Sequence, residues 1–173
     1  DSRKFMHDGE QYVLDLRQVC TNVNTGEKTE IALDGTTIIF LCETENGIIP
    51  ENALTSRNQL SLVTLPKNTV EIGKNAFSSN RKLVKVYMPA TVTTIGDYAF
   101  AACEAMTDIP ISEAITYIGE GAFQDCKSLT EFVIPGGITE IYANTFSKCG
   151  FEKIGIHGAS GEFFYMKKFP DTD

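Results

Sequence analysis

The sequence has few of the residues on which enzymatic chemistry and membrane insertion depend. Its only histidines are His7 and His157, so any Ser-His-Asp or Cys-His arrangement would have to use one of these two. It has no apolar run that approaches the roughly 18–20 residues of a membrane-spanning helix. These shortages argue against a catalytic triad and against insertion into a bilayer.

Basic residues are outnumbered as well. The chain has 15 Lys and Arg against 23 Asp and Glu, and its formal net charge is −8. An acidic protein without a basic stripe argues against nucleic acid and against anionic membrane surfaces as partners. The acidic residues do not follow calcium-loop spacing, and no glycine-rich loop is suited to cradle phosphate. We therefore predict neither a cofactor nor a metal site, and no enzymatic activity.

What the sequence does contain is a repeat of 23 residues. Phenylalanine recurs at this interval, and the residues around it recur with it. The four phenylalanines are Phe77, Phe100, Phe123 and Phe146. A fixed period of about 20–50 residues is typical of solenoids, in which one supersecondary unit is stacked many times.

Each unit begins with the spacing L-x-x-L-x-L, which predicts a short strand with its apolar residues on one face. A proline ends this strand in three units, whereas Pro110 lies inside the strand of the third. A second apolar pair follows, and we expect both members to face the core. The pairs are Thr69/Ile72, Val92/Ile95, Ile115/Ile118 and Ile138/Ile141.

Glycine comes next in three of the four units, as Gly73, Gly96 and Gly119, and Tyr142 stands at this position in the fourth. Because glycine adopts positive φ at low cost, we predict a turn here. We count five coils and a closing strand. The coils are a partial one, residues 37–59, and four full ones, which we call the first to fourth coils: residues 60–82, 83–105, 106–128 and 129–150.

The expected architecture is one structural domain, mainly β with short helical turns, in which the solenoid occupies residues 37–157. Residues 1–36 read as an N-terminal capping β-hairpin, with strands at 12–16 and 29–33 and a turn at 22–26. Residues 158–173 read as a C-terminal cap and tail with a short helix from Glu162 to Lys168. Such caps are needed because a solenoid otherwise leaves an open strand edge at each end.

Three of the five cysteines, Cys103, Cys126 and Cys149, share one repeat position. We expect them to stack as a buried column under the phenylalanines; a metal ladder and an inter-coil bridge are the alternatives. A zinc site would need about four converging ligands, whereas a column diverges along the axis. Cys20 and Cys42 are the only plausible disulfide pair.

The segment from Met88 to Cys103 (MPATVTTIGDYAFAAC) resembles the BspA-type leucine-rich repeat, and the tail from Ile156 to Lys168 resembles the segment that closes many such arrays. The resemblance covers about residues 37–168. It implies a right-handed parallel solenoid, an extracytoplasmic location and a role in adhesion or protein recognition. BspA-type arrays occur on surface proteins of oral and gut bacteria and of some mucosal protists. Since the chain begins at Asp1, we expect a mature or trimmed secreted chain that has lost its targeting segment.

The residues that flank the central apolar position of each strand should point outward. We select from them a candidate protein-binding face: Leu62, Thr64, Lys85, Tyr87, Asp108, Glu131 and Val133. Exposed apolar and tyrosine clusters often mark protein-binding sites. At the N-terminal end of this face we expect Ile39 and Leu41 to extend it as an apolar patch, unless the N-terminal cap folds over them.

Three functions fit these features. The first is an interaction module that binds a protein, such as an extracellular matrix protein or another surface protein. The second is a passive spacer within a larger envelope protein. The third is a hydrolase that uses Asp108 and Glu131, which occupy equivalent outward positions in adjacent coils. The sequence leaves the partner and the oligomeric state open.

Overall fold

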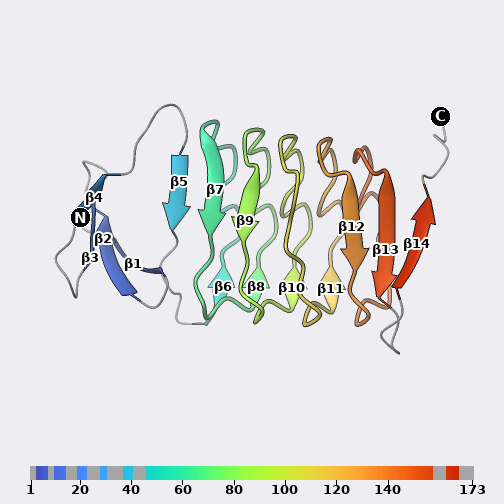
Figure 1. The fold of residues 1–173 in the computed structure, drawn as a ribbon, viewed down its shortest axis with the longest axis horizontal. Helices are drawn as coiled ribbons and strands as arrows, with labels where there is room; N and C mark the ends of the chain where they lie inside the picture. Colours follow the sequence, from blue (N-terminus) through green and yellow to red (C-terminus); the bar gives the residue numbers. More distant parts are fainter. Residues whose placement is uncertain are drawn as a thin grey trace.

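The computed structural model describes residues 46–157 in full, and outside that range it describes only the backbone of the strands. Two rows of short parallel strands run along the molecule (Figure 1). Most coils contribute one strand to each row, but residues 106–128 contribute none to the first row and residues 129–150 none to the second. The first row holds β5 (Thr37–Phe40), β7 (Leu60–Thr64), β9 (Lys85–Tyr87), β12 (Glu131–Ile134) and β13 (Lys153–His157). The second row holds β6 (Ile48–Ile49), β8 (Glu71–Ile72), β10 (Thr94–Ile95) and β11 (Tyr117–Ile118). The prediction of a mainly β solenoid of about five turns is confirmed.

An antiparallel sheet precedes the solenoid. It is formed by β1 (Arg3–His7), β2 (Glu10–Leu14), β3 (Val19–Asn22) and β4 (Lys28–Glu30), in that order. The sequence predicted two strands here, which overlap β2 and β4, and missed the other two. The sheet lies beyond the β5 end of the stack (Figure 1). That it caps the solenoid stays a prediction.

The C-terminal segment is a strand, so the helix predicted from Glu162 to Lys168 is wrong. β14 (Phe163–Lys167) pairs antiparallel with β13, with Ile154 opposite Met166 and Ile156 opposite Phe164. The free edge of β13 presents backbone donors and acceptors that a helix would leave unpaired, whereas an added strand satisfies them.

The segments that connect the two rows are turns, and the described residues form no helix, which corrects the prediction of short helical turns. The turn after each second apolar pair holds two residues with left-handed φ, four positions apart, and left-handed residues interrupt a right-handed helix. These residues are Asn52, Ser56, Asn75, Ser79, Tyr98, Ala102, Gly121, Asp125, Asn144 and Lys148. The phenylalanine between the two left-handed residues forms a backbone hydrogen bond to the next coil instead. Phe100 N–H donates to Ala122 O over 2.9 Å, and Phe123 N–H donates to Thr145 O over 2.9 Å.

The core is a column of stacked side chains, as the repeat predicted. The rings of Phe77 and Phe100 lie 5.3 Å apart and within 5° of parallel, and Phe123 and Phe146 stack at 5.7 Å. The predicted cysteine column is confirmed beside them, since Cys103 and Cys126 are buried and all three cysteines of the column are free thiols. Cys20 and Cys42, the other predicted pair, lie outside the residues whose side chains are described.

Glycine is required after the second apolar pair for close packing and not for backbone conformation. A turn follows Gly73, Gly96 and Gly119 as predicted, but these glycines lie outside the left-handed region, so positive φ is not what the position requires. A Cβ on Gly96 would lie 2.8 Å from the nitrogen of Lys74 and 2.9 Å from the carbon of Gly73. The backbones of successive coils therefore approach each other here more closely than a side chain allows.

The fourth coil departs from this arrangement because Tyr142 stands where the other coils have glycine. The second row ends at β11, and Ile141, which the repeat predicted to face the core, is 43% exposed. The Tyr142 ring lies against Tyr117, with centroids 5.5 Å apart. A Cβ does not fit at the equivalent position of the other coils, which accounts for the end of the strand row at Tyr142. The two coils meet again one residue later, where Gly121 N–H donates to Ala143 O over 3.2 Å.

Candidate functional site: the outward face of the first strand row

The predicted face residues lie on either side of a buried central row. Val63 and Val86 are fully buried, and Phe132 is nearly so. Strand register aligns their neighbours from coil to coil, with Leu62 opposite Lys85, Thr64 opposite Tyr87, and Lys85 opposite Asp108. Tyr87 is 46% exposed and Val133 is 37% exposed, whereas Leu62 and Thr64 are half-buried. This alternation follows from the two-residue period of a strand.

Lys85 links the exposed residues of the second and third coils. Its Nζ lies 3.5 Å from Asp108 Oδ2 and 5.2 Å from the centroid of the Tyr87 ring. An exposed ion pair contributes roughly 0–1 kcal/mol to stability, and an exposed cation–π contact about 0.5–1 kcal/mol. These weak contacts hold the ammonium group at the surface, where it can exchange its partners on binding.

Pro110 breaks the first row of strands. Residues 107–111 form no strand in the described chain and pair with β9 through the single bridge of Lys85 and Asp108, so the row divides into one sheet that ends at β9 and another that begins at β12. Proline has no backbone donor and fixes φ, and both properties oppose a strand with neighbours on each side. The predicted face is therefore divided, with Glu131 and Val133 on the second sheet.

A hollow of about 260 Å³ lies at this break. Its lining consists of Asp108, Ile109, Ile111, Glu131, Phe132 and Val133. The repeat pattern placed Pro110 inside the strand and Asp108 and Glu131 on the surface, but it predicted neither a hollow nor the contribution of Ile111. The signal was the proline itself, at a position where the neighbouring coils have Tyr87 and Val133.

The N-terminal extension of the face has a different register from the one expected. Ile39 is opposite Val63, in the central row, and Ile38 is opposite Leu62, because the register shifts between Thr37 and Ile38. The alignment of Ile39 with Leu62 is therefore wrong. Leu41 lies outside the described residues.

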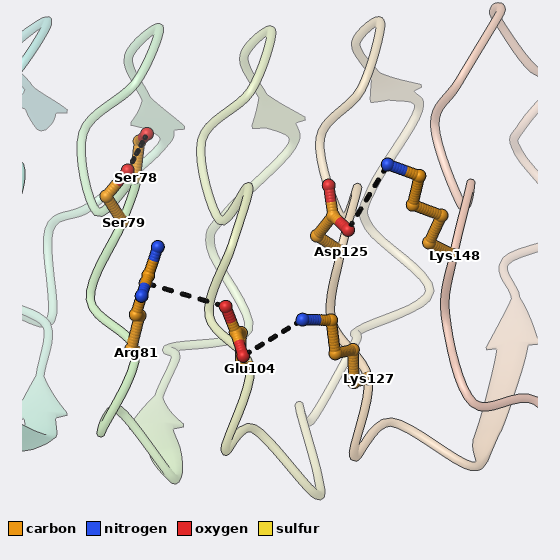
Figure 2. A network of polar contacts seen from close by, with 7 residues as sticks. All are labelled: Ser78, Ser79, Arg81, Glu104, Asp125, Lys127 and Lys148. Carbon is orange, nitrogen blue, oxygen red and sulfur yellow. Dashed lines mark hydrogen bonds and ion pairs between the residues drawn. The ribbon is translucent and has the colours of Figure 1, made fainter.

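A different set of charged side chains follows the turns, away from this face. Glu104 bridges two coils, with Oε1 3.5 Å from Arg81 Nε and Oε2 3.1 Å from Lys127 Nζ, as Figure 2 shows. Lys148 Nζ lies 3.8 Å from Asp125 Oδ1 in the same view. These ion pairs could have been predicted from the sequence, because side chains of opposite charge recur at the 23-residue spacing. These side chains pair with one another along the turns.

His157 contacts the third coil at the rim. Its Nδ1 lies 2.7 Å from Glu113 Oε2, and Gly136 N–H donates to the same oxygen over 3.3 Å. The hydrogen bond with His157 lowers the pKa of Glu113 below its ordinary value. His157 is half-buried at this rim.

The cysteine column does not have the properties of a reactive site. Burial raises the pKa of Cys103 and of Cys149 to about 12 and raises the pKa of Cys126 further. A buried thiol with a raised pKa forms little thiolate, which is both the nucleophile and the metal ligand. Within residues 46–157, no group of three or more His, Cys, Asp and Glu is arranged to hold a metal ion. The part of the chain that the structure describes also has no helix with the length and apolar character of a membrane span.

The repeat profile known as the BspA type leucine rich repeat region matches residues 45–169, in six copies. The chain belongs to the BspA-type leucine-rich repeat family. Among curated proteins, none matches this BspA-type chain.

Solved leucine-rich repeat structures resemble this BspA-type chain in fold. The leucine rich repeat protein TpLRR of T. pallidum aligns with a TM-score of 0.64 at 24% identity, over 70% of this chain and 59% of that protein. The pneumococcal vaccine antigen PcpA aligns with a TM-score of 0.50 at 12% identity, over 94% of this chain and 53% of that protein. A leucine rich cell surface protein from Faecalibacterium prausnitzii gives 0.44 at 21% identity, over 93% and 60%. This chain thus spans little more than half the length of each, and the likeness to TpLRR and PcpA establishes a leucine-rich-repeat solenoid.

Proposed function

We propose that this BspA-type array is a non-enzymatic interaction module outside the cell that binds a protein through the outward face of its first strand row. The contact residues would be Leu62, Thr64, Lys85, Tyr87, Asp108, Glu131 and Val133. Leucine-rich repeats typically mediate protein–protein binding, and the family supports a surface location and a role in adhesion. The partner would be an extracellular matrix protein or another surface protein.

The observation that carries this proposal is the exposure of Tyr87 beside a cation. Tyr87 is nearly half exposed. Its strand, β9, pairs with β7 on one side and is bridged to Asp108 on the other, so the backbone of Tyr87 is fixed. Tyrosine provides a large contact area at a low cost in side-chain entropy, and it is enriched among the residues that dominate binding energy. Lys85 adds a charge within reach of the same partner.

Tyr87→Ala tests the proposal directly. We expect saturable binding to at least one immobilised protein among fibronectin, fibrinogen, mucin and bacterial surface extract. Tyr87→Ala should weaken that binding about 5- to 30-fold, because a central aromatic residue contributes roughly 1–2 kcal/mol. Biolayer interferometry with the purified, folded chain measures both quantities.

Tyr117→Ala is the matched control, since Tyr117 is 37% exposed but belongs to the second strand row. It should bind as the unsubstituted chain does. Equal losses in the two variants would place the contact elsewhere. The absence of binding to every protein of the panel would favour a passive spacer instead.

A further inference from the structure

The hollow at the break in the first strand row has the size of a side chain rather than of a metabolite. Its volume of about 260 Å³ lies below the roughly 300–1,000 Å³ of small-molecule pockets. Its apolar lining runs from the nearly buried Ile109 and Phe132, 7% and 4% exposed, to the half-buried Ile111 and the exposed Val133. An occupant would therefore place an apolar section against these side chains.

Two carboxylates also line the hollow, one from each side of the break. Asp108 comes from the third coil and Glu131 from the fourth, and both are exposed. Asp108 has Lys85 as an ion-pair partner at 3.5 Å, whereas Glu131 has none among the residues that the structure describes. The charged end of an occupant would therefore be positive, because a negative end would be repelled and a neutral apolar end would desolvate the carboxylates without pairing them.

We propose that this hollow receives a single arginine or lysine side chain of the protein partner. The aliphatic stem lies between Ile111 and Val133, and the cationic group lies between Asp108 and Glu131. Long basic side chains combine an apolar stem with a charged end, and a planar guanidinium can donate to two carboxylates at once. This inference rests on the proposed function and adds the chemistry of one partner residue.

The test is an NMR titration of the ¹⁵N-labelled chain with the peptide Ac-Gly-Arg-Gly-NH2. We expect its addition to shift the amide resonances of residues 108, 109, 111 and 131–133, with millimolar affinity. The citrulline peptide Ac-Gly-Cit-Gly-NH2, which has the same shape without the charge, should leave these resonances in place. The corresponding lysine peptide shows which of the two basic side chains binds more tightly.

Three variants distinguish binding in the hollow from nonspecific attraction of a basic peptide to an acidic protein. Glu131→Gln should weaken binding of the arginine peptide about two- to fivefold, the range of an exposed ion pair. Asp125→Asn removes the same charge from the turn side, where Asp125 pairs with Lys148, and should change nothing. Pro110→Val installs the residue found at position 133, keeps both carboxylates, and should abolish the shifts by restoring the strand and closing the hollow.

Equal shifts with the arginine and citrulline peptides, shifts spread over the acidic surface, or unchanged binding by Glu131→Gln would each overturn the proposal. Glu131→Gln keeps the test decisive even where Pro110→Val does not fold. Failure of the arginine peptide to bind would also overturn the proposal about the hollow, while Tyr87-dependent binding of a protein partner would remain. Loss of that partner binding alone would instead reject the proposed function, while the peptide shifts remained.

Discussion

The three stacked cysteines show how one repeat position combines packing with hydrogen bonding. Each Sγ donates to the carbonyl oxygen of the phenylalanine 26 residues earlier, at 3.3 Å for Cys103, 3.2 Å for Cys126 and 3.1 Å for Cys149. Asn80 takes the same position one coil before Cys103, and its amide donates to Phe77 O and Leu54 O over 2.6 Å and 2.7 Å. The position therefore needs a small donor that points along the stack, and a thiol and a primary amide both provide one.

At this scale we predict that the buried thiols resist alkylation in the folded protein. With a pKa of about 12, Cys103 is almost wholly protonated at pH 8, and its burial excludes the reagent. Iodoacetamide at pH 8 should label Cys103 and Cys126 at least about 100-fold more slowly in the folded chain than in guanidinium chloride. Half-buried Cys149 should react sooner. Peptide mass spectrometry reads the three sites separately.

The unfolded chain in guanidinium is the control for reagent quality, and there all three thiols should react alike. Rapid labelling of Cys103 in the folded protein would contradict the buried column. It would also make thiol chemistry at this column plausible, since a thiol that reacts quickly must be accessible and partly ionised.

At the scale of the element, the spacing of successive coils depends on glycine. The N–H of Gly96 donates to Ile72 O over 2.8 Å, and the N–H of Gly119 donates to Ile95 O over 2.9 Å. These bonds hold the coils together at the point where a Cβ cannot fit. The fourth coil shows the consequence of losing the glycine, because the second row ends before Tyr142.

We therefore expect Gly96→Ala to destabilise the protein by about 2–3 kcal/mol, the cost of forcing extra volume into a packed site. The added methyl group would meet backbone atoms of Lys74 and Gly73, which cannot move aside as a side chain could. Urea unfolding followed by circular dichroism measures the change.

Gly137→Ala is the matched control. A Cβ there would first meet the Thr116 methyl group at 3.3 Å, a side chain that can shift. Its effect should lie within about 0.5 kcal/mol of zero, since alanine also restricts the unfolded chain. Similar losses in both variants would show that glycine acts through backbone conformation and not through close packing.

At the scale of the whole molecule, one contact joins parts of the stack that are not neighbours. Glu113 belongs to the third coil and His157 to the closing strand, with the fourth coil between them. The fourth coil contributes the N–H of Gly136 to the same carboxylate. This contact holds the C-terminal end together in the region where the second strand row has already ended.

The contact predicts a dependence of stability on pH. Because the folded state lowers the pKa of Glu113, its contribution is present at pH values above the ordinary glutamate pKa. It is lost as the pH falls through the folded pKa. Glu113→Gln should lower Tm by about 1–3 °C at pH 6, a small effect because the side chain is exposed. At pH 3 the difference should shrink toward zero.

Differential scanning calorimetry of both proteins at the two pH values measures this change. Glu120→Gln provides the comparison, since Glu120 is an exposed carboxylate outside the contact with His157. A Tm difference for Glu113→Gln that persists unchanged at pH 3 would assign the effect to packing instead of charge.

Much of the architecture could be predicted from the sequence because the same spacing of apolar residues recurs in every coil. Val63, Val86 and Phe132 are buried where the strand spacing placed them, and Tyr87 and Val133 are exposed beside them. Within the regular repeat, the errors concerned the backbone of the turns, which form no helix and do not use positive φ at Gly73, Gly96 and Gly119. The other errors occurred where a single residue departs from the repeat or where the chain leaves it. The segment around Phe164 was assigned to a helix because the sequence predicted the closing strand, β13, but not that a further strand would pair with its free edge.

The sequence by itself determined the period, the core column and the two-sided character of each coil, since these follow from local spacing of apolar residues. Only the tertiary structure decided what the exceptions do. Pro110 divides the first strand row and opens a hollow, and Tyr142 ends the second row. The physical reason is that the repeat shows which residue type usually packs at a position, but not how the neighbouring coils respond to an exception such as Pro110 or Tyr142. The effect of a misfit depends on how far the coils on either side can move.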